Sequence, residues 1–268
     1  MSANPYEAPR SALADPVEVH DETGFLDTPR RVPASHGGKW VSAAWEMFKS
    51  TPAVWLLVAL MYVGMLYGTR FVPYVGILGV TFLFPYFYGV LILLADGIRR
   101  GRGADLGAAM AALVPHMSAL AVLGLVYIAI SVVSAVVAYV PLMGLDSLGI
   151  LIGRVPVVGK EFYIAAAIRW VILIPMGFLL HYSHNLVILH GRTPLQAMRT
   201  SFAACLRNIP AFLYFSMVLV GLVIGATLPL LLGWFVLLPV MLLINYVSYR
   251  DIFFAPSGNG APQAAGNA

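Results

Sequence analysis

The stretch PAVWLLVALMYVGMLYGT, residues 52–69, begins with a proline and contains no charged side chain. A transmembrane helix needs about 20 mostly apolar residues. Within a bilayer, each backbone amide must be paired inside its own segment or around a closed barrel. An unbroken apolar run, without the alternation of a barrel strand, therefore predicts a membrane-spanning helix here.

Five more long, mostly apolar runs follow, namely Phe71–Ala95, Pro115–Val140, Ile164–Leu189, Pro210–Ala226 and Pro229–Tyr249. The chain of 268 residues is 60% hydrophobic and only 10% charged, whereas a soluble domain has about 25% charged residues. We therefore expect an all-α fold, a polytopic membrane helical bundle with six transmembrane helices.

The six runs form three pairs, and the leading run of each pair begins at a proline: Pro52, Pro115 and Pro210. A short amphipathic stretch precedes each pair, at residues 41–49, 105–113 and 193–207. In the third stretch we expect Thr193 to be the N-cap and Pro194 to occupy the first helical position. The sequence thus predicts three hairpins, each preceded by a short interfacial helix, and suggests an internal threefold repeat.

The two ends of the chain differ in composition from the rest. Residues 1–38 are rich in proline and acidic side chains and contain few apolar ones, so we expect a disordered cytoplasmic tail. Residues 39–254 form the predicted membrane domain. Residues 255–268 have the composition of a second disordered cytoplasmic tail.

The distribution of positive charge predicts the orientation. With both termini in the cytoplasm, twelve of the sixteen Lys and Arg residues face the cytoplasm, and the other side holds only Arg70, Arg154, Lys160 and Arg169. Positive residues favour the cytoplasmic side of short loops. The net charge of +4 therefore reflects topology. Because the basic residues are dispersed and no recognition module accompanies them, we expect no nucleic-acid binding.

Two features of the apolar runs suggest how the helices pack. Glycines spaced four apart, at Gly64/Gly68 and Gly221/Gly225, are typical of close helix–helix packing. Each trailing run contains an internal proline: Pro85, Pro175 and Pro239. These prolines predict helix kinks. Alternatively, they open unpaired carbonyls toward a midplane site, as in transporters with broken helices.

The most polar patch within an apolar run contains His181, His184 and Asn185. The two histidines are three residues apart and can share a helix face, which makes them weak candidates for a metal or proton-relay site. Catalytic zinc needs about three protein ligands, so a carboxylate such as Asp96 would have to approach across the fold. The other interpretation is interhelical hydrogen bonding near the membrane surface.

Basic residues on the cytoplasmic side are candidate contacts for lipid or anions: Arg99, Arg100, Arg102, Arg192, Arg199, Arg207 and Arg250. The loop after Asp96 is either a solvated basic turn against anionic lipid or a headgroup pocket shared with Arg250 and Asp251. On the other side, Arg169 either extends to the membrane surface or contacts an anion such as a lipid phosphate.

Three segments resemble a family of uncharacterised six-helix bacterial inner-membrane proteins. They are Lys39-Trp40-x4-Trp45-x2-Phe48-Lys49-x2-Pro52-x2-Trp55, Pro194-Leu-x-Ala197-x3-Ser201-x5-Arg207-Asn208 and Tyr246-x2-Tyr249-Arg250-Asp251-Ile252-Phe253. The family is distantly similar to membrane regions that accompany glycerophosphodiester phosphodiesterases. The segment Asn4-Pro5-Tyr6-x2-Pro9 resembles an N-terminal tag of small bacterial membrane proteins. The resemblance implies a bacterial inner-membrane location and the six-helix fold, and it implies no activity.

No catalytic, nucleotide-binding or metal-binding motif accompanies these features, so we expect neither a cofactor nor enzymatic activity. Our leading hypothesis is a non-enzymatic protein that acts in lipid handling, envelope organisation or membrane-protein assembly. Its expected partners are membrane lipids and a membrane protein recruited through the N-terminal tail. The alternatives are a small-solute or lipid transporter and, less favoured, a metal-dependent membrane enzyme.

Overall fold

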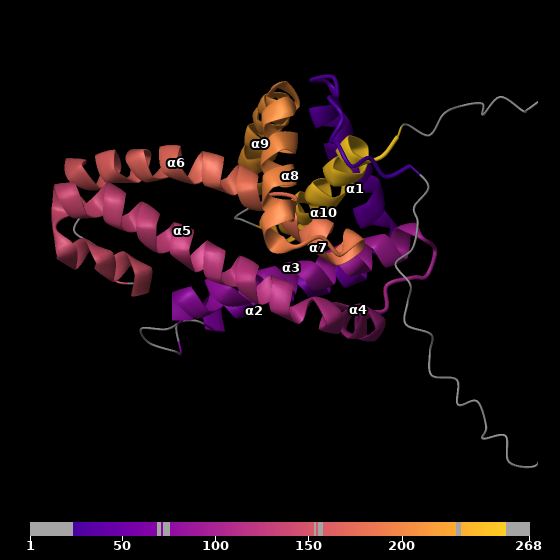
Figure 1. Cartoon of the computed structure of the whole chain (residues 1–268), viewed down its shortest axis with the longest axis horizontal. Helices are drawn as coiled ribbons and strands as arrows, with labels where there is room; N and C mark the ends of the chain where they lie inside the picture. Colours follow the sequence, from indigo (N-terminus) through magenta and orange to yellow (C-terminus); the bar gives the residue numbers. More distant parts are fainter. Residues whose placement is uncertain are drawn as a thin grey trace, which may run out of the picture.

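The computed structural model describes residues 24–68, 71, 76–152, 154, 158–228 and 232–255. The elements in order are α1 (His36–Ser50), α2 (Pro52–Gly68), α3 (Gly76–Arg99), α4 (Leu106–Leu113), the 3-10 helix η2 (Val114–His116), α5 (Met117–Met143), the 3-10 helix η3 (Leu145–Ile152), α6 (Lys160–Leu180), α7 (Ser183–His190), α8 (Pro194–Arg207), α9 (Ile209–Thr227) and α10 (Trp234–Phe253). Figure 1 shows their arrangement. Within these ranges the only β pairing is an isolated bridge between Phe25 and Phe254. The all-α prediction is confirmed.

Five helical stretches of the described chain are long and apolar enough to cross a membrane: Leu78–Arg99, Leu106–Met143, Lys160–His190, Ile209–Thr227 and Trp234–Phe253. A sixth candidate is the pair α1 and α2, which passes the same test jointly but bends by 103° at the break between them. The predicted runs and the observed helices coincide closely, because an apolar segment in lipid satisfies its backbone only as a continuous helix.

The predicted short helices precede the three hairpins, but the second one differs. The first, α1, buries one stripe made of Gly37, Trp40, Ala44 and Phe48 before the chain turns at Thr51. A residue before proline is disfavoured in helical conformation, which accounts for the sharp turn. In contrast, α4 runs through η2 into α5, so that Leu106–Met143 is one stretch of 38 residues. The third unit is built as expected.

The start of α8 confirms the predicted capping residues. The Thr193 hydroxyl accepts from the Gln196 amide at 3.4 Å, and the Gln196 side chain accepts from the Thr193 amide at 3.3 Å. Pro194 occupies the first helical position. This reciprocal capping box satisfies two amides that have no partner inside the helix.

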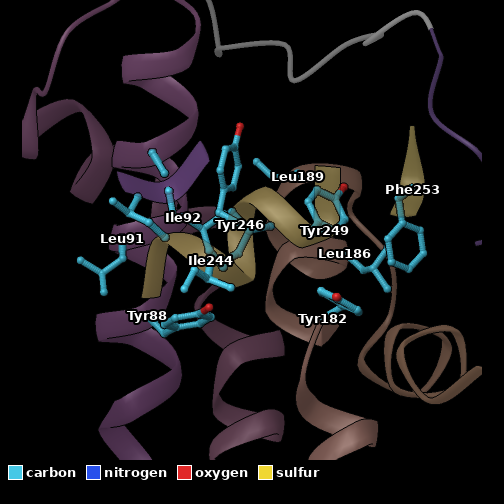
Figure 2. Close-up of a cluster of buried hydrophobic side chains, with 14 of the residues drawn as sticks. Tyr88, Leu91, Ile92, Tyr182, Leu186, Leu189, Ile244, Tyr246, Tyr249 and Phe253 are labelled. Carbon is cyan, nitrogen blue, oxygen red and sulfur yellow. The ribbon is translucent and has the colours of Figure 1, made fainter. Parts of the chain in front are cut away.

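The hydrophobic core is centred on α3 and α10. Figure 2 shows Ile244 and Tyr246 of α10 between Ile92 of α3 and Leu186 of α7, with Phe253 beyond Leu186. The second hairpin is different, because α5 and α6 lie side by side and project beyond the other helices (Figure 1). Their far end has a separate small core made of Ala135, Ala138, Tyr139 and Ala165.

Residues 24–35, which we call the N-terminal strap, correct the predicted domain boundary. We expected disorder through residue 38, but the strap is paired with the end of α10. The Leu26 amide donates to the Phe253 carbonyl at 2.8 Å, and the Ala255 amide donates to the Gly24 carbonyl at 2.8 Å. The Val32 amide donates to the Asn208 side-chain oxygen at 2.8 Å. These hydrogen bonds hold the strap together with buried Val32 and the Phe25 ring, which stacks on His190. The predictions for residues 1–23 and 256–268 lie outside the described residues.

The four glycines predicted to lie at helix contacts do not lie there. A Cβ atom added at Gly64, Gly68, Gly221 or Gly225 would meet nothing within 4 Å in the described part of the chain. Close approach occurs at other glycines. A Cβ atom at Gly37 would lie 2.7 Å from the Phe215 amide of α9, and one at Gly124 would lie 2.7 Å from the Phe82 carbonyl of α3. Single glycines such as Gly37 and Gly124 therefore make the close helix contacts, and the predicted glycine pairs do not.

The three internal prolines lie within continuous helices. Pro85 is in α3, Pro175 is in α6 and Pro239 is in α10. Pro85 and Pro239 are buried and Pro175 is half-buried. None of the three lines either of the two pockets described below. The alternative of prolines around a transport site thus finds no support in those pockets.

Candidate functional site

Asp96, in the last turn of α3, is the centre of a charged cluster. Asp96 is only 3% exposed. The carboxylate accepts from Arg100 Nε at 2.6 Å, from Arg99 Nη2 at 3.2 Å and from Arg102 Nη2 at 3.4 Å. It also accepts from the Tyr246 hydroxyl of α10 at 2.8 Å. A buried carboxylate is stable only when it is paired and hydrogen-bonded in this way.

The loop after α3 brings these arginines back to Asp96. Gly101 and Gly103 have φ angles of +73° and +78°, a conformation that glycine adopts without strain. The Arg102 amide donates to the Gly97 carbonyl at 2.9 Å, which holds the turn closed. The loop ends at Asp105, whose side chain accepts from the Ala108 amide at 2.9 Å and caps α4.

A pocket of about 310 Å³ lies between this loop and α4. Its polar lining comes from Asp96, Arg100, Arg102 and Asp105. Its apolar lining comes from α3, α4 and α7, through Leu93, Leu94, Ala108, Ala109, Ala112 and Leu189. The pocket is therefore amphipathic, with charged groups beside a wall of leucine and alanine. The second described pocket, beside Trp55 and Tyr88, has a volume of only about 10 Å³.

The predicted pocket partners Arg250 and Asp251 lie elsewhere. Arg250 lies over the Phe254 ring at 3.6 Å. Asp251 binds the strap and α1: it pairs with Arg30, contacts His36 Nδ1 at 2.7 Å and accepts from Trp40 Nε1 at 2.8 Å. Asp251 therefore fastens the strap and does not line the pocket. The residue of α10 that contacts Asp96 is Tyr246.

The other predicted basic residues divide into two groups. Arg192 pairs with Asp27 of the strap and lies 5.7 Å from the Phe25 ring. Arg199 and Arg207 are exposed on α8. Of the seven predicted contacts, only Arg100 and Arg102 line the amphipathic pocket, and Arg99 supports it by donating to the Tyr246 hydroxyl at 2.9 Å.

The two histidines do not form a joint site. His184 lies in a ring of aromatic side chains, with centroids 5.2 Å from Tyr88 and 5.7 Å from Tyr127. His181 lies instead 5.2 Å from Phe212 of α9. No group of three or more metal-ligating side chains is present among the residues that the structure describes. The metal interpretation of this pair thus lacks a set of ligands.

The amides beside the histidines join neighbouring helices. The Asn185 side chain of α7 donates to the Asn245 oxygen of α10 at 2.8 Å. In turn, Asn245 donates to the His181 carbonyl at 2.7 Å. These contacts agree with the alternative interpretation of this patch, namely interhelical hydrogen bonding.

Sequence reasoning missed the wall of the pocket that α4 provides and the hydroxyl that α10 supplies. Asp96 and Tyr246 are 150 residues apart, and no local pattern connects them. The available signal was a single acidic residue followed by three arginines within six positions.

Together, the fold and the pocket define a multi-pass helical membrane protein with an amphipathic charged pocket at one end of the bundle. No family model matches the chain, and no curated protein or solved structure is significantly similar to it. The resemblance to six-helix bacterial inner-membrane proteins therefore stays a prediction.

Proposed function

We propose that the protein is a non-enzymatic bacterial inner-membrane protein, with both termini in the cytoplasm, that binds an anionic lipid headgroup in the Asp96 pocket. The observation that carries the proposal is the pairing of Arg100 and Arg102 with an apolar wall in one cavity. An amphiphile offers the matching chemistry, because it joins a charged headgroup to acyl carbons.

The charges around the pocket favour an anion. Three guanidinium groups pair with Asp96, and Asp105 is the other carboxylate that lines the pocket, which leaves one positive charge in excess. Arg102 makes the longest of the three contacts to Asp96, at 3.4 Å, and its side chain is 53% exposed. A guanidinium in this position can donate to a phosphate while it remains near Asp96, and such charge-assisted hydrogen bonds are about twice as strong as neutral ones.

The position of the pocket supports the same assignment. It lies at the end of α3, a membrane-spanning candidate, and next to the loop that carries the densest positive charge in the chain. Positive loops face the cytoplasm, where the inner leaflet presents anionic lipids. Lipid handling or envelope organisation would follow from such binding. Recruitment of a membrane protein through the N-terminal tail stays a prediction.

Lipid retention in native mass spectrometry tests the proposal. The purified protein in detergent is titrated with phosphatidylglycerol and, separately, with zwitterionic phosphatidylcholine. We expect preferential phosphatidylglycerol adducts, and we expect Arg102→Gln to weaken their binding about tenfold, since one charge-assisted hydrogen bond contributes about 1.5 kcal/mol. The matched control is Arg207→Gln, which removes an exposed arginine outside the pocket. Equal retention by the two variants would refute the assignment.

A further inference from the structure

Arg169, on α6, is a cation inside a membrane-spanning stretch, Lys160–His190, and all its described partners are uncharged. Its Nε donates to the Ser134 hydroxyl at 3.3 Å, and its Nη2 donates to the Ser131 hydroxyl at 3.3 Å. The guanidinium also lies 5.9 Å from the centre of the Tyr139 ring. All three partners come from α5, which lies beside α6 in Figure 1.

The hydroxyls on α5 are oriented to accept from this arginine. Ser134 is fully buried. Its hydroxyl donates to the Ser131 carbonyl of its own helix at 3.0 Å. With its proton used in this way, the Ser134 oxygen is left as an acceptor for Arg169 Nε. The arginine is therefore held against α5 at a fixed place along the hairpin.

No acidic side chain neutralises Arg169 in the described part of the chain. The nearest acid along α6 is Glu161, which lies eight residues away and pairs with Lys160 at 3.9 Å. Arg169 lies nine positions after the start of α6 at Lys160, about 13.5 Å along the helix axis. A guanidinium without an acidic partner in a membrane-spanning stretch is costly in hydrocarbon, and a functional partner is the first explanation to test.

Arg169 is half-buried against α5. The next residue, Trp170, lies about 100° further around the helix and is 68% exposed, so Arg169 lies at the edge of the α5 contact, where lipid can approach it. Of the five N–H donors of a guanidinium, the two serines use two. A phosphate offers the negative charge and the acceptor oxygens that suit the remaining fork.

We propose that Arg169, together with Ser131 and Ser134, binds the phosphate of a membrane phospholipid from the leaflet opposite the Asp96 pocket. The headgroup is drawn inward along the α5–α6 hairpin to reach the guanidinium. The site is separate from the Asp96 pocket and uses different helices, so it stands whether or not that pocket binds lipid.

Native mass spectrometry of the purified protein with phosphatidylglycerol tests this site. We expect the wild-type protein to retain a tightly bound lipid whose adduct drops at least fivefold in Arg169→Gln and is unchanged in Arg102→Gln. A monodisperse size-exclusion peak for Arg169→Gln reports correct folding. The control Lys160→Gln removes a cation from the exposed start of the same helix and should change nothing.

Three results would overturn the proposal. One is an unchanged adduct pattern in Arg169→Gln. The second is displacement of the lipid by millimolar inorganic phosphate, which would make the ligand a free anion. The third is a wild-type oligomer that Arg169→Gln converts to a monomer, which would make a partner helix the counter-ion. If Arg169→Gln does not give a monodisperse protein, Arg169→Lys keeps the charge and loses the fork. We then expect at least a twofold loss of the adduct, and no loss would refute the site.

Discussion

Replacing Gly37 with alanine would place a methyl group in the contact between α1 and α9. The new Cβ atom would lie 2.7 Å from the Phe215 amide nitrogen and closer still to the Ala211 carbonyl oxygen. Ordinary contact begins at 3.4 Å, so the two helices would have to separate by at least about 0.7 Å. Both obstacles are backbone atoms, which cannot turn aside as a flexible side chain does.

Contacts between α1 and α10 oppose such a shift. Trp40 donates to Asp251 at 2.8 Å, and His36 contacts the same carboxylate at 2.7 Å. Overpacking of this kind costs about 1–3 kcal/mol, and weakening one hydrogen bond costs about 1 kcal/mol more. The better helix propensity of alanine returns up to about 1 kcal/mol. The expected net loss is about 1–3 kcal/mol, or roughly 2–12 °C in Tm.

Thermal unfolding in detergent, followed by tryptophan fluorescence and by size-exclusion elution, measures this loss. The matched control is Gly221→Ala on α9, where the added Cβ would meet nothing within 4 Å. We expect the control to unfold at or slightly above the wild-type temperature. If Gly37→Ala and Gly221→Ala shift Tm equally, the assignment of the contact glycines is wrong.

Two further experiments test the attachment of the strap and the burial of Cys205 on α8. Asp251→Asn removes the charge that pairs with Arg30, and we expect the strap to lose about 1–3 kcal/mol of local stability. Tryptic cleavage at Arg30-Arg31 should then become about 5- to 150-fold faster. The control Glu46→Gln breaks only the exposed pair with Lys49 and should leave the cleavage rate unchanged. An unchanged rate in Asp251→Asn would mean that Asp251 does not fasten the strap. Burial raises the pKa of the Cys205 thiol from 9.0 to about 12, so at pH 9 the folded protein should contain about 500-fold less thiolate than the unfolded chain. The folded state favours the protonated thiol, so the contribution of Cys205 to the free energy of unfolding is complete below pH 9 and is lost as the pH rises toward 12. Iodoacetamide should therefore label Cys205 at pH 9 only after denaturation, and rapid labelling of the folded protein would contradict its buried position.

The sequence predicted the helices well because lipid leaves an apolar segment few alternatives. Pro52 and Pro194 marked helix starts correctly, since proline fits the first turn and not the interior. The face that a helix turns toward its neighbours was harder to predict. The four-residue spacing of glycines at Gly64 and Gly221 was visible in the sequence. However, a helix that is apolar on all sides has no polar face to indicate which side is buried.

The candidate site was predicted only in part, for a different reason. Asp96 and its arginines are local in sequence, so their clustering could be foreseen. The Tyr246–Asp96 hydrogen bond and the Arg30–Asp251 pair join residues that are 150 or more positions apart. The α4 wall of the pocket is closer in sequence but depends on how α4 packs against α3. The strap was missed because its order depends on hydrogen bonds and ion pairs to distant residues such as Phe253 and Asp251, and composition does not encode these.

The pairing of the strap with the end of α10 also fixes the parity of the membrane crossings. Gly24 and Ala255 are hydrogen-bonded neighbours, so the two ends of the described chain lie on the same side of any membrane that the helices cross. Five crossings between them would place these ends on opposite sides. An even number is required, and if the five single stretches all cross, the bent pair formed by α1 and α2 supplies the sixth crossing.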